Sequence, residues 1–351
     1  MSPIQGYRRR KLFLLGAAAA IVAYLWHNLS FEWICNETNE DWFARFKANE
    51  KALMAAGDNK TRKYRLEVRE GDVFVLGAMK SGTTLVQLIA HNIRTKGTHQ
   101  TKNIYEDTFY VPPFYLPNVD VDYGQDQIAT PRIMKTHEHW DTLPKGPSLR
   151  YLYVLRNPVD VLLSSLEFSL GFLGRNSSNS FQLRDMACGL CVMRSRTGNL
   201  LGRPVRHLVS FWPVLSGPNQ TQFLMVFYED LVEDPRTSVE VISEFMGIQL
   251  TEEETRNVLR LSSFDYVKKN KIFLAQTVLT QTLGPKTWKT PMDIANKGQL
   301  YRGKTELPLA VLSNWISELV FRMKVGWLAG VSDYQELRNK YSPVLKRKRK
   351  T

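Results

Sequence analysis

The sequence predicts an α/β fold in which helices cover both faces of a central parallel β-sheet. Four short apolar runs have the length of buried strands: residues 73–76, 133–134, 151–155 and 223–227. Three stretches with helical periodicity lie between or after these runs: residues 85–93, 159–168 and 239–246. Buried strands that alternate with helices favour parallel pairing, with the apolar runs covered on both sides.

The composition is that of a globular protein with a sizeable core, since 43% of the 351 residues are hydrophobic and 23% are charged. The three cysteines, Cys35, Cys188 and Cys191, are too few for a disulfide scaffold or a structural zinc site. Much of the net charge of +13 comes from residues 8–11 and 346–350, so the body is only mildly basic. We therefore expect no metal and no nucleic acid, although an anionic ligand would suit the body.

The N-terminal part of the chain predicts a membrane anchor. Residues 12–26 carry no charge, four basic residues precede them, and Trp26 and Trp33 lie near the far end. Basic residues before an apolar run indicate a cytoplasmic start. We expect a cytoplasmic segment at residues 1–11 and a type II signal anchor at 12–31, with a Golgi location. A cleaved signal peptide, or a buried segment of a cytoplasmic protein, stays open.

The remainder divides into three parts. Residues 32–66 are polar with one apolar helical face and predict a stem, residues 67–330 carry the domain, and residues 331–351 form a basic tail. Glycosylation sequons at Asn36 and Asn59 favour a luminal glycoprotein.

A loop for an anion follows the first predicted strand. The strand runs into Gly77, a tight loop holds Lys80, Ser81 and Gly82, and an apolar helix begins near Thr84. This arrangement directs backbone N–H groups and a helix N-terminus at one point, which suits phosphate or sulfate. The nucleotide-binding loop G-x-x-x-x-G-K-[ST] has its Lys after the second Gly, whereas here Lys precedes that Gly by two positions.

Five segments, in order, resemble the motifs of sulfotransferases that use 3′-phosphoadenosine 5′-phosphosulfate (PAPS). The resemblance covers about residues 65–275 and is closest to the cytosolic-type, small-molecule branch. The segments are the phosphosulfate loop with Lys80, Ser81, Gly82, Thr83 and Thr84, the catalytic Lys135-Thr136-His137, the 3′-phosphate residues Arg156 and Ser164, the strand end with Tyr228, and the adenine-side Ser262 and Phe264.

The resemblance implies a P-loop-NTPase-like fold and transfer of a sulfuryl group from PAPS to a hydroxyl of a small-molecule, lipid or carbohydrate acceptor. His137 would remove the acceptor proton, and Lys80 and Lys135 would stabilise charge on the reacting oxygens. The product would be 3′,5′-adenosine bisphosphate (PAP). The expected partners are the acceptor and, through the anchor, a membrane, with a homodimer left open.

The residues support these roles independently. Arg156 lies just past a buried strand and Ser164 eight residues further on, so both can reach one phosphate at the carboxyl edge of the sheet. Lys135 and His137 are two positions apart, which places both side chains on one face of an extended chain. Neighbouring lysines should lower the pKa of His137 and keep it neutral.

The chain departs from the family pattern in two places. Leu85 stands where the family has a Trp that packs on adenine, and the C-terminal segment that closes over the 3′-phosphate is not intact. Two partial matches compete for that segment, at residues 296–298 and 302–304. We prefer Arg302, because Arg makes bidentate phosphate contacts and Asn296 cannot.

Two alternatives remain at this stage. A P-loop-type small-molecule kinase needs a Gly-Lys-[Ser/Thr] element, which is missing, and a carboxylate at a strand end, which only Glu229 and Asp230 offer. A catalytically inactive, membrane-anchored relative would explain the damaged C-terminal segment but not the retained Lys80, Lys135 and His137.

The anchor makes a prediction about modification. If residues 12–31 span a membrane with residues 8–11 in the cytoplasm, Asn36 and Asn59 face the lumen and become glycosylated. Peptide-N-glycosidase should then increase the electrophoretic mobility of the expressed protein. An unshifted band, together with release by a carbonate wash, would contradict the anchor.

Overall fold

The computed structural model describes residues 67–111, 124–158, 160–161, 164, 204–217, 220–270, 272 and 325–349. The predicted anchor, the stem with Asn36 and Asn59, and Arg302 lie outside these residues. Within the described ranges, no helix has both the length and the apolar character required to cross a bilayer.

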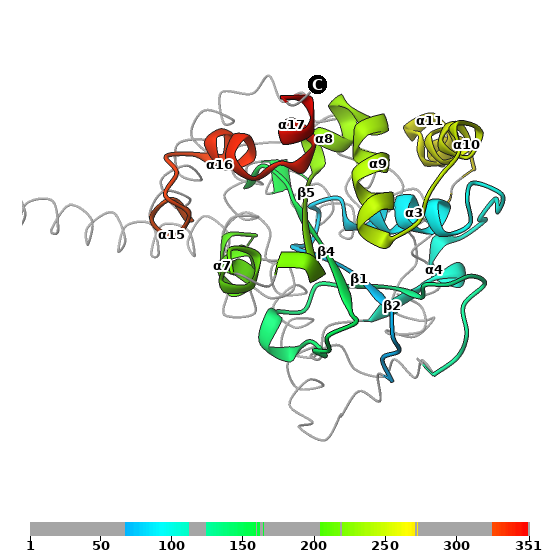
Figure 1. Ribbon diagram of the computed structural model, residues 1–351, viewed down its shortest axis with the longest axis horizontal. Helices are drawn as coiled ribbons and strands as arrows, with labels where there is room; N and C mark the ends of the chain where they lie inside the picture. The colour runs from blue at the N-terminus through cyan, green and yellow to red at the C-terminus, as the bar shows by residue number, and fades with distance from the viewer. Residues whose placement is uncertain are drawn as a thin grey trace, which may run out of the picture.

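A five-stranded parallel sheet forms the centre of the molecule (Figure 1). Its spatial order is β2-β3-β1-β4-β5, and every neighbouring pair is parallel. The predicted runs all become strands, which confirms the predicted fold class. The strands are β1 (Val73–Gly77), β2 (Phe109–Val111), β3 (Ile133–Thr136), β4 (Arg150–Leu155) and β5 (Phe223–Phe227).

The strand β2 was not predicted, because this edge strand has three residues, of which only Val111 is buried. The central position of β1 has a consequence for ligands. The chain passes from β1 to β2 and β3 on one side of β1 and then returns to β4 on its other side, and the carboxyl end of a strand at such a reversal is where α/β sheets bind ligands.

Helices lie on both faces of the sheet (Figure 1). Their bounds are α3 (Thr83–Arg94), α4 (Ile104–Asp107), α7 (Pro204–Leu215), α8 (Tyr228–Glu233), α9 (Pro235–Met246), α10 (Glu252–Ser262), α11 (Phe264–Asn270), α15 (Trp327–Ala329), α16 (Tyr334–Tyr341) and α17 (Pro343–Lys348). Two short 3-10 helices, Trp140–Thr142 and Gln220–Gln222, complete the description. The helices predicted at 85–93 and 239–246 are confirmed as α3 and α9, whereas most of 159–168 lies outside the described residues.

Alternate residues of β1 face two separate apolar cores. Phe74 and Leu76 belong to the core that contains α7 and α16, and Val73 and Val75 belong to the core that contains α3, α9 and α10. All four side chains are completely buried. Burial on both faces explains why β1 reads as a continuous apolar run without alternation.

The C-terminal segment packs on the domain up to residue 349. This corrects the prediction that residues 331–351 form a tail. Leu337 is completely buried, and the buried Arg338 donates to Asp230 Oδ1 from Nε at 2.9 Å, with a second guanidinium nitrogen at 2.8 Å. Ser342 Oγ donates to the other oxygen of Asp230 at 2.5 Å. The basic run of this segment is also paired in part, because Arg347 contacts Glu244.

The buried ion pair makes a stability prediction. Arg338→Met should lower the free energy of unfolding by about 3 to 5 kcal/mol, because Asp230 would be left as a buried charge without its main partner. Arg236→Met is the matched control, since its pair with Glu252 is about half exposed, and it should cost at most about 1 kcal/mol. Urea unfolding of both variants measures this, and equal losses would contradict it.

Candidate active site

The loop after β1 is held in a conformation that requires glycine twice. Gly77 has φ +155°, and a Cβ there would lie 2.5 Å from the carbonyl oxygen of Val154. Gly82 has φ +97°, and a Cβ there would lie 2.4 Å from the ring of Tyr228. Lys80 between them also adopts a left-handed conformation, with φ +65°, which few non-glycine residues populate. The helix α3 starts directly after this loop, so its N-terminus faces the carboxyl edge of the sheet.

Arg156 lies at this edge, directly after β4, and is only 8% exposed. One terminal guanidinium nitrogen donates to the carbonyl oxygen of Lys80 at 3.2 Å, and the guanidinium carbon lies 4.4 Å from the ring centre of Tyr228. Its buried Nε has no hydrogen-bond partner among the described residues. Because an unpaired buried donor is costly, this nitrogen is suited to an anionic oxygen of a ligand.

His137 is fixed against the phosphate loop. Leu76 pairs with Thr136 in the β1–β3 register, so the next residues of the two strands, Gly77 and His137, are neighbours. His137 Nδ1 lies 2.8 Å from the carbonyl oxygen of Gly77. Since a carbonyl only accepts, Nδ1 carries the proton and Nε2 of the neutral ring keeps its lone pair.

Burial is the main cause that lowers the pKa of His137 to about 3, with Lys135 and Lys80 adding to it. The sequence predicted this effect from the two lysines alone. A neutral imidazole with a lone pair on Nε2 can accept a proton near pH 7.

Lys135 comes from the end of β3, and its side chain is buried next to the start of α3. Its Nζ donates to Thr84 Oγ1 at 2.6 Å and to the hydroxyl of Tyr105 at 3.1 Å. The same ammonium lies 5.2 Å from the ring centre of Tyr105 and 5.5 Å from that of Tyr110. Neither tyrosine belongs to a motif, so no sequence pattern singled them out.

The structure brings together most of the predicted site residues at the carboxyl edge: the loop from Lys80 to Thr84, Lys135, His137, Arg156 and Tyr228. Ser262 lies elsewhere, where its Oγ accepts from Asn92 near the end of α3 at 2.9 Å. Phe264 begins α11, and Ser164 is buried in a helical position. Contacts of these three residues with a ligand stay predictions.

Two further histidines, His139 and His207, lie near the segment that carries His137. His207 of α7 is buried, and its Nε2 lies 3.0 Å from the carbonyl oxygen of Glu138, to which it donates. Its Nδ1 lies 3.0 Å from the hydroxyl of Tyr153, which therefore donates to it. His139 contacts Ser210 at 3.1 Å. His207 thus ties α7 and β4 to the segment that carries His137, which is a structural role.

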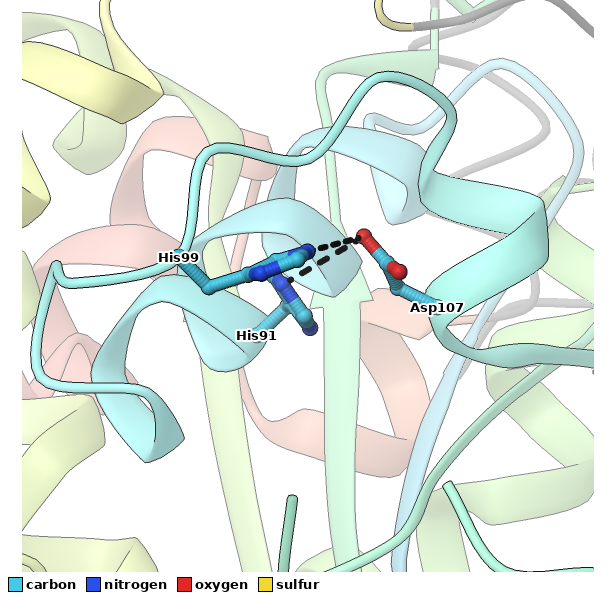
Figure 2. Close-up of side chains that lie close together, drawn as sticks. All are labelled: His91, His99 and Asp107. Atoms are coloured by element: carbon cyan, nitrogen blue, oxygen red, sulfur yellow. Dashed lines mark hydrogen bonds and ion pairs between the residues drawn. The ribbon is translucent and has the colours of Figure 1, made fainter. Parts of the chain in front are cut away.

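A cluster of His91, His99 and Asp107 lies beside α3 and α4 (Figure 2). Asp107 Oδ2 is 3.1 Å from His99 Nε2 and 3.7 Å from His91 Nε2. The Arg94 guanidinium, however, lies 3.0 Å from His91 Nδ1 and can only donate, so the neutral His91 carries its proton on Nε2. A cation beside Asp107 would need a lone pair on His91 Nε2, and the proton occupies that position. The cluster suits an anchor for α4 better than a metal site.

Comparisons with known proteins agree with this geometry. A family model described as the sulfotransferase domain matches residues 70–305. The chain is 30% identical over 206 residues to the amine sulfotransferase of Oryctolagus cuniculus, covering 58% of this chain and 64% of that protein. It is 29% identical over 224 residues to sulfotransferase 2A1 of Homo sapiens, covering 60% and 72%. The match thus spans less than two thirds of the rabbit relative.

Among solved structures, retinol dehydratase in a complex with retinol and PAP has a TM-score of 0.51 and 20% identity. The likeness covers 80% of this chain and 85% of that one. At this identity the likeness concerns the fold, which is the predicted one.

Proposed function

Because the chain belongs to the sulfotransferase family, we propose that it transfers a sulfuryl group from PAPS to a hydroxyl of a small-molecule, lipid or carbohydrate acceptor. The observation that carries the proposal is the tautomer of His137, which presents the Nε2 lone pair at the sheet edge where Lys80 and Lys135 lie. When bound, PAPS supplies an activated sulfuryl group and a phosphate leaving group.

The residues at the edge fit such a ligand. The unpaired Nε of the buried Arg156 offers a donor to a phosphate, and the glycines of the loop allow backbone N–H groups to approach one closely. His137 Nε2 accepts the proton of the acceptor hydroxyl, and Lys80 and Lys135 hold positive charge beside the reacting oxygens. Fixed cations in a site of low water content are typically the largest contribution to transfer of this kind.

The kinase alternative loses support from the structure. Asp230 accepts from Arg338 and Ser342, and Glu229 accepts from the backbone N–H of Asn157 at 2.9 Å and the hydroxyl of Tyr334 at 2.6 Å. Both carboxylates therefore serve the packing of the C-terminal helices instead of being available for Mg²⁺.

An inactive relative would bind PAP without transferring sulfuryl groups, so labelled PAPS with a panel of hydroxyl acceptors tests the proposal directly.

We also propose that residues 12–31 anchor the protein as a type II membrane protein of the Golgi, with the domain in the lumen. The support is the basic segment 8–11 before an apolar run, together with the sequons Asn36 and Asn59. Homodimer formation stays a prediction, because the described residues carry no observation that bears on it.

The proposed contact of Arg156 with the 3′-phosphate predicts which ligands the protein binds. The protein should bind PAP more tightly than ATP, which lacks a 3′-phosphate, and Arg156→Ala should weaken PAP binding by about 30-fold, because a charge-assisted contact contributes about 2 kcal/mol. Arg150→Ala, at the opposite end of β4, is the matched control and should leave PAP affinity near wild type. Calorimetry measures both. Equal affinity for PAP and ATP, or no effect of Arg156→Ala, would overturn the assignment.

The role of His137 makes a kinetic prediction. In His137→Gln, turnover at saturating PAPS should fall by about 100-fold or more, the range of general-base catalysis, while PAP affinity and the thermal midpoint stay near wild type. Because the pKa of His137 is lowered to about 3, the imidazole stays neutral as pH falls from 7.5 to 6. The wild-type kcat/KM should therefore show no loss from this group in that interval. Turnover that survives in the variant would make His139 the next candidate.

A further inference from the structure

A tyrosine that belongs to none of the predicted motifs contacts a predicted catalytic residue. Tyr105 lies in α4, and its hydroxyl accepts a hydrogen bond from Lys135 Nζ at 3.1 Å. Its ring centre is 5.2 Å from the same nitrogen. One side chain thus contacts the ammonium through both its hydroxyl and its aromatic face.

The chemistry of an ammonium group gives these contacts a direction. Lys carries three N–H donors and no acceptor. Two of them are directed at neutral oxygens, Thr84 Oγ1 at 2.6 Å and the Tyr105 hydroxyl at 3.1 Å. Among the described residues no carboxylate lies within ion-pair distance of Lys135. Two hydroxyl acceptors therefore fix the orientation of the ammonium without neutralising its charge, and the third N–H is directed away from them.

The helix that carries Tyr105 is anchored at both ends. The side chain of Asn103 accepts from the backbone N–H of Tyr105 at 3.1 Å, at the start of α4. At the other end, Asp107 contacts His99, and the guanidinium of Arg94 donates to the carbonyl oxygen of Asp107 at 2.7 Å. Figure 2 shows how the histidines of this cluster converge on the Asp107 carboxylate. A four-residue helix has little stability of its own, so these contacts set the position of Tyr105.

We propose that Tyr105 is a positioning residue of the reaction centre, which orients Lys135 toward the oxygen that bridges phosphorus and sulfur in PAPS. The proposal rests on the proposed function, because that function places this oxygen at the carboxyl edge of the sheet. Tyr105 acts through Lys135 and makes no bond to the reacting atoms. Its effect should therefore disappear when Lys135 no longer carries an ammonium group.

A double-mutant cycle on PAP affinity tests this dependence, because PAP retains the 5′-phosphate. Calorimetry would compare Tyr105→Phe, Lys135→Met and the double variant with wild type, all in the full chain. Tyr105→Phe keeps the ring and removes only the hydroxyl, so it should weaken PAP binding by about 3- to 10-fold, the range of one hydrogen bond. In the Lys135→Met background the same substitution should change PAP affinity by less than about 2-fold.

The matched control is Tyr341→Phe, whose ring also lies beside lysine ammonium groups, at 5.5 and 5.8 Å, but on α16. It should leave PAP affinity unchanged, and the thermal midpoint of Tyr105→Phe should stay near wild type. Equal fold-changes in both Lys135 backgrounds, no effect in the wild-type background, or a loss that follows the thermal midpoint would overturn the proposal. A wild type that binds PAP but transfers nothing refutes only the proposed function, and one that binds no PAP refutes both.

Discussion

The hydrogen bond from His137 Nδ1 to the carbonyl oxygen of Gly77 joins the two parts on which the rest of the site depends. It connects the end of β3 to the phosphate loop after β1, and it selects the tautomer that leaves Nε2 as an acceptor. The bond exists only because Leu76 and Thr136 are paired, so the register of two central strands sets the protonation pattern of the imidazole. Gly77 cannot be replaced without moving Val154, which belongs to the strand on the other side.

Four buried cations among the described residues form two groups with different partners. Arg132 pairs with Asp72 at 2.7 Å and Arg338 with Asp230 at 2.8 Å, both pairs being almost completely buried. Lys135 and Arg156 are also buried, but they contact hydroxyls, aromatic rings and a backbone carbonyl. The first group is neutralised inside the protein and stabilises it. The second keeps its positive charge for an anion, which lowers the stability of the empty site but favours binding.

The parts of the fold that are continuous in the chain could be predicted from the sequence. The apolar runs became strands because each is buried on both faces, and the loop around Lys80 follows its strand directly. Contacts between distant segments were not predictable: Tyr105 reaches Lys135 only because β2 and β3 are paired and α4 precedes β2. The charges of residues 331–351 predicted a tail, but packing is decided by Leu337 and Arg338, which follow Tyr334 at three- and four-residue spacing on one helical face.

The pairing of Asp230 with Arg338 spans 108 positions of the chain. Asp230 directly follows Tyr228 and Glu229, so this part of the site is synthesised long before its partner emerges from the ribosome. Until residue 338 is available, the carboxylate must stay hydrated, which keeps the end of β5 from becoming a dry interior. The buried pair therefore forms by a long-range closure between a segment made early and one made late, after the helices that cover β5 have been synthesised.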